Sequence, residues 1–205
     1  MATTFPLARI AVALLFLSLA ACSFSSPPST FYTLTALVPE SMEPAVPGAA
    51  TRTTVAVGPV EIADYLARPE IVTRSNANTL KIAPIERWGG TLRTNVVRTL
   101  RDNLGLLLGP SGCRIVAWES PIPADYRMAI TIARFEEDES NKVILEADWL
   151  LFAEQGSKVA ATGSSRVVEE VTGKGYSATV DSMGRALAVL SRELAIRMQG
   201  VMDAP

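Results

Sequence analysis

The chain has few groups that could act as nucleophiles, and none is accompanied by the base that nucleophilic catalysis requires. It has 205 residues and no histidine, which excludes Ser-His-Asp and Cys-His pairs, imidazole metal ligands and histidine acid–base catalysis. No G-x-S-x-G pattern surrounds Ser164 or Ser165. Cys113 has hydrophobic neighbours at Ile115 and Val116, and such a thiol is more often a buried small side chain than a nucleophile. We therefore expect a protein that is not an enzyme.

Two short motifs could bind ions, and each has a second interpretation. Residues 136–139 (EEDE) carry carboxylates of the kind that Ca²⁺ and Mg²⁺ prefer, but the spacing and glycine of an EF-hand are missing. A solvated hairpin tip is the favoured interpretation. Gly173-Lys174-Gly175 resembles part of a phosphate-binding loop, but Val168 stands where its first glycine should be. We interpret it as a flexible joint, and the sequence predicts neither a metal nor a cofactor.

The cysteine at position 22 follows a segment that is typical of exported proteins. Residues 10–20 are uncharged and apolar, with Arg9 before them. As a helix this run would span about 16 Å, too short for the ~30 Å hydrocarbon core of a bilayer but typical of a signal peptide. Leu19-Ala20-Ala21-Cys22 resembles the lipobox of bacterial lipoproteins, in which small residues admit the peptidase and the cysteine thiol accepts a diacylglycerol. An ordinary secretory signal with an incidental cysteine is the alternative.

Lipidation of Cys22 would divide the chain into three parts. Residues 1–21 are the signal peptide, residues 22–51 the lipidated N-terminus and a flexible Ser/Pro-rich tether, and residues 52–205 a single folded domain. Within the tether, residues 30–37 have the composition of a first strand or a docked extended segment. Several acyl chains, palmitate included, would give stable anchoring. Because Ser23 rather than aspartate follows the cysteine, we expect an outer-membrane lipoprotein that faces the periplasm.

The sequence of residues 52–205 predicts strands, a helix, further strands and a second helix. Residues 53–62 are β-rich, and Gly58-Pro59 indicates a bulge or an edge position because proline cannot donate to a ladder. Shorter β-like runs occupy 70–74, 79–82 and 113–118. Three longer runs predict an antiparallel meander: 126–136, 142–154 and 158–170. Trp149 and Phe152 in this meander are more often core residues than the lining of a ligand pocket.

Two segments, 86–108 and 177–202, each carry one apolar stripe at helical spacing. Arginines on the opposite face of the first helix could dock an acidic partner or lipid headgroups, although a solvated face is the default. The fold class is therefore α/β, with a mixed, largely antiparallel sheet of five to seven strands and two long helices packed on it. The balance of 19 basic and 21 acidic residues argues against binding of nucleic acid, which requires a basic patch.

Between the first two β-rich runs, a loop places large side chains among turn residues. Such loops pack on their own domain or form interfaces. The run from Val57 to Arg74 (VGPVEIADYLARPEIVTR), followed by Glu86-Arg87-Trp88, resembles the ABC-type transport auxiliary lipoprotein family, as does Phe31-Tyr32-Thr33-Leu34 after the lipobox. The resemblance marks six residues as a family signature or partner interface: Tyr65, Leu66, Arg68, Pro69, Arg87 and Trp88.

The family resemblance implies a non-catalytic accessory subunit of an intermembrane lipid transport system that contributes to envelope integrity. Its implied partners are the membrane, through the acyl chains, together with an MCE-domain protein and an inner-membrane permease, and self-association into a homo-oligomer is compatible with it. Two alternatives remain. A stand-alone lipoprotein that binds lipid or another hydrophobic ligand needs a closed apolar cavity, and a cell-envelope hydrolase is disfavoured by the missing histidine.

Overall fold

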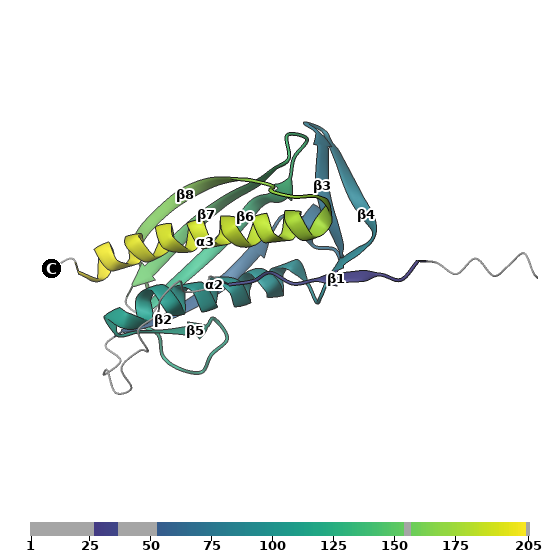
Figure 1. Cartoon of the computed structure of the whole chain (residues 1–205). Helices are drawn as coiled ribbons and strands as arrows, with labels where there is room; N and C mark the ends of the chain where they lie inside the picture. The colour runs from purple at the N-terminus through teal and green to yellow at the C-terminus, as the bar shows by residue number, and fades with distance from the viewer. Residues whose placement is uncertain (1–26, 37–52, 154–156, 204–205) are drawn as a thin grey trace, which may run out of the picture.

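A mixed sheet with two helices on one face forms the body of the molecule (Figure 1). The computed structural model describes residues 27–36, 53–153 and 157–203, so the signal peptide, Cys22 and residues 37–52 lie outside the described residues. The strands are β1 Thr30–Tyr32, β2 Thr53–Ile62, β3 Glu70–Asn76, β4 Thr79–Trp88, β5 Cys113–Ala117, β6 Tyr126–Glu137, β7 Lys142–Ala153 and β8 Lys158–Glu170. The helices are α2 Leu92–Leu108 and α3 Gly175–Met202, with short 3₁₀ turns η1 Asp64–Leu66 and η2 Gly109–Ser111.

The sheet is organised around β6. One edge of β6 pairs antiparallel with β7, which pairs in turn with β8. The other edge pairs parallel with β2, and at its far end with β3, where Thr73 lies opposite Glu137. Beyond them, β2 pairs with β5, and β3 leads through β4 to β1. Two consecutive strands therefore follow each other along a single edge of β6, and the η1 turn between them lies beside it.

The predicted fold class is correct in outline, but its detail differs. In the described residues the sheet has eight strands rather than five to seven, and four of its pairings are parallel: β1–β4, β2–β5, β2–β6 and β3–β6. The antiparallel pairs are the β3–β4 hairpin and the β6–β8 meander, which join neighbours in sequence. A register shift between Val57 and Val60 confirms the bulge predicted at Gly58-Pro59.

The two helices run side by side over the same face of the sheet (Figure 1). α2 packs on β2 and β5, whereas α3 packs on β6, β7 and β8. Their apolar stripes are buried, with Val96, Leu100 and Leu104 fully inaccessible. A buried hydrogen bond from Asn103 Nδ2 to Ser191 Oγ (3.0 Å) joins the helices. The predicted one-sided amphipathicity therefore matches a single layer of helices on a sheet.

The start of the first helix was predicted six residues too early. Residues 86–88 are the end of β4, and the helix begins at Leu92 after the N-cap Thr91, whose Oγ1 accepts a hydrogen bond from the Thr94 N–H (3.1 Å). Gly90, with φ of 104°, separates the two elements. Trp88 lies four residues before Leu92 and so extends the apolar stripe, but it is held in the sheet by pairing with Tyr32.

A glycine in β8 makes room for the core tryptophan of β7. Trp149 is buried, lies opposite Gly163 and donates from Nε1 to Ser165 Oγ (3.2 Å). A Cβ at Gly163 would come within 2.4 Å of the indole ring. Trp149 therefore belongs to the core, as the sequence indicated.

Gly163→Ala is expected to destabilise the protein by about 1–3 kcal/mol, because the indole must leave its position. Gly105→Ala in α2 is the matched control, since a Cβ there meets nothing within 4 Å and should be neutral or stabilising by up to ~1 kcal/mol. Urea unfolding of both variants measures the difference. Equal stability of the two alanine variants would contradict the packing of Trp149 on Gly163.

Candidate interaction site

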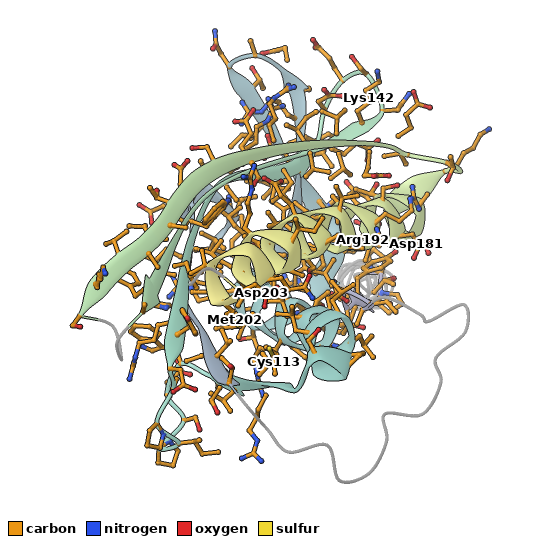
Figure 2. The ribbon with its side chains drawn as sticks, turned by 90° about the vertical axis from the view of Figure 1, so that its left-hand side faces the viewer. Cys113, Lys142, Asp181, Arg192, Met202 and Asp203 are labelled. Atoms are coloured by element: carbon orange, nitrogen blue, oxygen red, sulfur yellow. The ribbon has the colours of Figure 1, made fainter. Side chains whose placement is uncertain are left out.

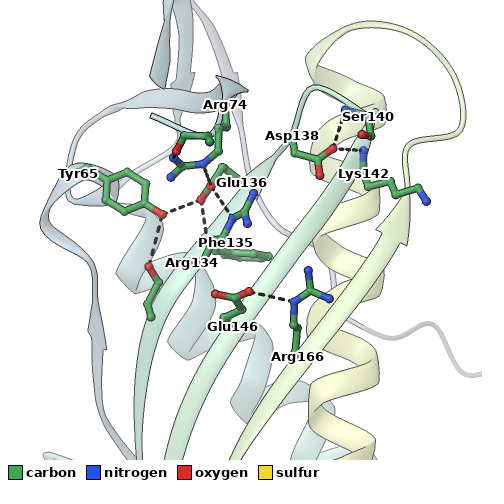
Figure 3. Close-up of polar contacts among 12 residues, drawn as sticks. Tyr65, Arg74, Arg134, Phe135, Glu136, Asp138, Ser140, Lys142, Glu146 and Arg166 are labelled. Carbon is green, nitrogen blue, oxygen red and sulfur yellow. Dashed lines mark hydrogen bonds and ion pairs between the residues drawn. The ribbon is translucent and has the colours of Figure 1, made fainter. Parts of the chain in front are cut away.

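A buried carboxylate lies where η1, β3 and β6 meet (Figure 3). The Glu136 side chain is 0% exposed. It accepts hydrogen bonds from Arg74 Nε (2.7 Å), Arg134 Nε (2.9 Å), the Tyr65 hydroxyl (2.7 Å) and the Phe135 backbone N–H (3.1 Å). We call Tyr65, Arg74, Arg134 and Glu136 the Glu136 cluster. A buried charge is tolerated only when it is paired and hydrogen-bonded in this way.

Strand geometry and sheet topology bring the cluster together. Side chains alternate along β6, so Phe135 enters the core while Arg134 and Glu136 share the opposite face. Arg74 comes from β3, which meets β6 at the Thr73–Glu137 pair. Tyr65 comes from η1, the turn between the two strands that line the same edge of β6. The Glu136 cluster therefore lies where the edge of β6 stops pairing with β2 and begins to pair with β3.

The prediction that residues 136–139 form a solvated hairpin tip is wrong for Glu136. Glu136 and Glu137 belong to β6, and only the following residues form the turn. There Asp138 Oδ1 accepts from the backbone N–H groups of Ser140 (2.8 Å) and Lys142 (3.2 Å). The four acidic residues 136–139 are adjacent in sequence and suggested one acidic patch. In the structure, Glu136 is a buried ion-pair partner on β6, whereas Asp138 stabilises the turn that follows. Among the residues that the structure describes, no group of three or more acidic or cysteine side chains could hold a metal.

The electrostatics of the cluster keep the Tyr65 hydroxyl protonated. Burial raises the pKa of Tyr65 well above its usual value, and the hydrogen bond to the Glu136 carboxylate raises it further. Arg74, whose guanidinium lies 5.8 Å from the Tyr65 ring centroid, opposes this shift in part. The bond to Glu136 in turn raises the pKa of Arg74. At neutral pH this protonated phenol is a hydrogen-bond donor rather than a base, so the Glu136 cluster holds its side chains in place.

Tyr65→Phe is expected to lower stability at neutral pH by about 1.5–3 kcal/mol, because a charged acceptor loses a donor. The folded pKa of Tyr65 lies above its unfolded value, so this contribution is present below pH ~10 and is lost as the pH rises through the folded pKa. The gap between wild type and variant should therefore narrow above pH ~10.

Urea unfolding at several alkaline pH values measures this gap. Tyr126→Phe, at the opposite end of β6, is the control for the loss of a phenol elsewhere in the sheet. A gap that stays constant with pH would contradict the bond between Tyr65 and Glu136.

A second ion group joins the two stretches that carry the family signature. Glu70 pairs with Arg68 (3.3 Å) and with Arg87 (3.6 Å), and the two arginine side chains are 39% and 41% exposed. The Pro69 carbonyl oxygen accepts from the Trp88 N–H (2.8 Å). Of the six predicted signature residues, Leu66 and Trp88 are thus core residues, Tyr65 belongs to the Glu136 cluster, and Arg68 and Arg87 remain accessible on the surface.

The N-terminal segment is clamped to the helices, in part by Asn95, a residue that sequence reasoning did not single out. Leu34 is buried, and its N–H donates to Asn95 Oδ1 (3.2 Å) while its carbonyl oxygen accepts from Arg98 Nη2. Thr35 crosses α3 at Gly184, where a Cβ would lie 3.3 Å from its carbonyl oxygen. Arg98 therefore binds the N-terminal segment of its own chain, so it does not belong to a free, solvated helix face. An asparagine on the buried stripe of α2 was the signal that could have revealed the clamp.

Comparison with known proteins shows which family has this sequence pattern. A family model described as the ABC-type transport auxiliary lipoprotein component matches residues 32–195. The chain belongs to this family. The match begins at Tyr32, in the strand that precedes the clamped Leu34, and runs into α3, so it takes in both halves of the signature.

Two solved structures share the fold of this auxiliary lipoprotein. An uncharacterized protein is 19% identical with a TM-score of 0.70, and the alignment covers 84% of this chain and 99% of that chain. Protein XCC0632 from Xanthomonas campestris is 18% identical with a TM-score of 0.67, and the alignment covers 85% of this chain and 100% of that chain. No curated protein sequence matches the chain at a significant level.

An open cleft of about 590 Å³ lies between the β3–β4 hairpin and the start of α3 of the auxiliary lipoprotein. Charged side chains of both signs line it: Arg74, Lys81, Glu137, Asp138 and Lys174. Gly173 and Gly175 adopt φ of 120° and 76°, which supports the strand-to-helix joint expected there. The cleft is polar and does not have the character of an enclosed lipid cavity.

Cys113 is half-buried at the start of β5, with its Sγ 3.9 Å from Met202 Sδ at the end of α3 (Figure 2). Burial raises the pKa of the Cys113 thiol, which keeps it in the unreactive protonated form. This agrees with its interpretation as a packed small side chain. Neither α2 nor α3, nor any other helix in the described ranges, is long and apolar enough to cross a bilayer.

Proposed function

We propose that this auxiliary lipoprotein is a non-catalytic subunit of an intermembrane lipid transport system, held at the membrane by acyl chains on Cys22. Its partners would be an MCE-domain protein and an inner-membrane permease, and its place the periplasmic side of the outer membrane. The observation that carries the proposal is the family match over residues 32–195, joined to the Leu-Ala-Ala-Cys sequence that precedes it.

The docked N-terminus supports a role in placement. Because β1 pairs with β4 and the Leu34 backbone is hydrogen-bonded to Asn95 and Arg98 of α2, residues 30–34 are fixed to the domain. Thr30 lies eight positions after Cys22, a span of at most about 28 Å when fully extended. A tether of this length would keep the domain beside its own membrane, so a partner would have to reach it there.

The Glu136 cluster also supports a role in placement, because it makes one end of the sheet rigid. It fixes η1 and the β3–β4 hairpin against β6 by charge-assisted hydrogen bonds, which are stronger than neutral ones. The η1 turn and the hairpin are thereby held in one arrangement relative to the rest of the sheet. A rigid surface lowers the ordering cost of docking. The cleft between the β3–β4 hairpin and the start of α3 is open and charged, so it gives the stand-alone lipid carrier no such support.

Genetic epistasis tests the proposal. Deleting the gene for this chain should sensitise cells to detergents to the same degree as deleting the gene for the MCE-domain protein, and the double deletion should be no worse than either. A permease gene and an MCE gene beside this one would agree with that result. Additive defects in the double deletion would place the protein in a separate process.

A further inference from the structure

Phe31 is an aromatic side chain left in the open. It is 65% exposed on β1, whereas Leu34 three residues later is buried. Among the strongly exposed large apolar side chains of the described residues, Phe31 is the only aromatic one. Phenylalanine has no polar side-chain atom that water can hydrogen-bond, so covering its ring would be favourable.

The neighbours of Phe31 give that surface a mixed character. Phe31 lies in register with Arg87, and Arg87 with Glu70, so the three side chains share one face of the sheet. Arg68 binds the same glutamate. The two arginines, each about two-fifths exposed on its side chain, outnumber the single carboxylate that they share. An aromatic ring flanked by arginines is the composition of a protein surface that lies in the headgroup region of a bilayer.

The position of Phe31 in the chain places it close to the proposed lipid anchor. It follows Cys22 by nine residues, which reach at most about 30 Å. The root-mean-square distance for a flexible chain of this length is about 17 Å. At such separations a tethered group experiences its target at an effective concentration in the millimolar range. A contact too weak to hold a free protein on a membrane would therefore be well populated in the anchored one.

We propose that Phe31 inserts into the headgroup boundary of the membrane that holds the acyl chains, with Arg68 and Arg87 directed at the lipid phosphates. The β1 edge of the sheet then faces the bilayer, and the C-terminal end of α3, on the opposite side of the molecule in Figure 1, points away from it. This orientation rests on the proposed lipidation of Cys22, but it makes a separate claim about the folded domain.

Site-directed fluorescence tests the orientation. Full-length acylated protein carrying Cys113→Ser and Phe31→Cys is labelled with an environment-sensitive dye and reconstituted into phosphatidylethanolamine–phosphatidylglycerol vesicles. The Cys22 thiol is consumed by its diacylglycerol and does not react. Ile196→Cys in α3 is the matched control, because Ile196 is 68% exposed. Ser29→Cys, also exposed, is a second reporter if labelling at position 31 disturbs β1.

The dye at position 31 should gain intensity and be quenched by nitroxide-labelled lipid, whereas the dye at position 196 should show neither effect. Flotation of the vesicles reports anchoring independently, so protein that fails to float contradicts the lipidation and not the orientation. Protein that floats with positions 29, 31 and 196 equally unquenched would overturn the inference. A concentration-dependent signal at position 31 without vesicles would assign the surface to a second copy of the chain, and would overturn it as well.

Discussion

Glu136→Ala is expected to destabilise the domain by about 3–5 kcal/mol, the range found when one partner of a buried ion pair is removed. The substitution leaves Arg74 and Arg134 facing each other, with side chains only 19% and 25% exposed and no carboxylate between them. It also removes the acceptor of the Tyr65 hydroxyl. Since most small domains are stable by only 5–15 kcal/mol, the loss should be evident as a large decrease in the urea midpoint.

Glu146→Ala is the matched control for this variant. Glu146 lies on the neighbouring strand, in register with Arg134, and binds Arg166 at 3.0 Å (Figure 3). Both members of that pair are well exposed, at 61% for Arg166 and 38% for Glu146, and exposed pairs contribute about 0–1 kcal/mol. If the two alanine variants unfolded at the same urea concentration, the Glu136 cluster would have no special role in holding β3 and η1 on β6.

Cys22→Ala is expected to abolish membrane attachment. Without the thiol no diacylglycerol can be added, so the proposed lipid anchor is lost. The variant should take up no radioactive palmitate and should stay in the supernatant when membranes are sedimented. Two or more acyl chains make anchoring effectively stable, at about 0.8 kcal/mol per buried CH₂, so the difference from wild type should be nearly complete.

Cys113→Ala is the control for the Cys22 variant, because it removes the other cysteine of the chain. Cys113 is half-buried beside Met202, so its loss should leave palmitate labelling and sedimentation unchanged. Labelling that persists in Cys22→Ala would show that the Leu-Ala-Ala-Cys sequence is not a lipobox.

Local sequence signals predicted the elements of this fold better than their pairing. The β6–β8 meander and the stripe of α3 follow from alternation and helical spacing within one segment, and both match the structure. The parallel pairs do not follow from any local pattern. In β2–β6, for example, Val55 lies opposite Tyr126, across the intervening β3, β4, α2 and β5. Such pairings are decided by how the whole sheet buries its apolar face.

The candidate site shows the same limit. The family signature pointed to η1 and to Arg87 and Trp88, and the structure joins these stretches through Glu70 and the Pro69–Trp88 hydrogen bond. Glu136 could not be assigned to them because its role depends on the register of β6 against β3. The Asn95 clamp was missed because a buried polar residue on an apolar stripe has meaning only once its partner, the Leu34 backbone, is in place.

Co-purification from native membranes tests the central claim of this account most directly. The wild-type chain, tagged at its C-terminus and extracted in mild detergent after cross-linking, should bring down an MCE-domain protein and an inner-membrane permease, both identified by mass spectrometry. The Cys22→Ala form, expressed at the same level, should recover much less of both. Recovery of membrane-bound wild-type protein with neither partner would contradict its assignment as a subunit of an intermembrane lipid transport system.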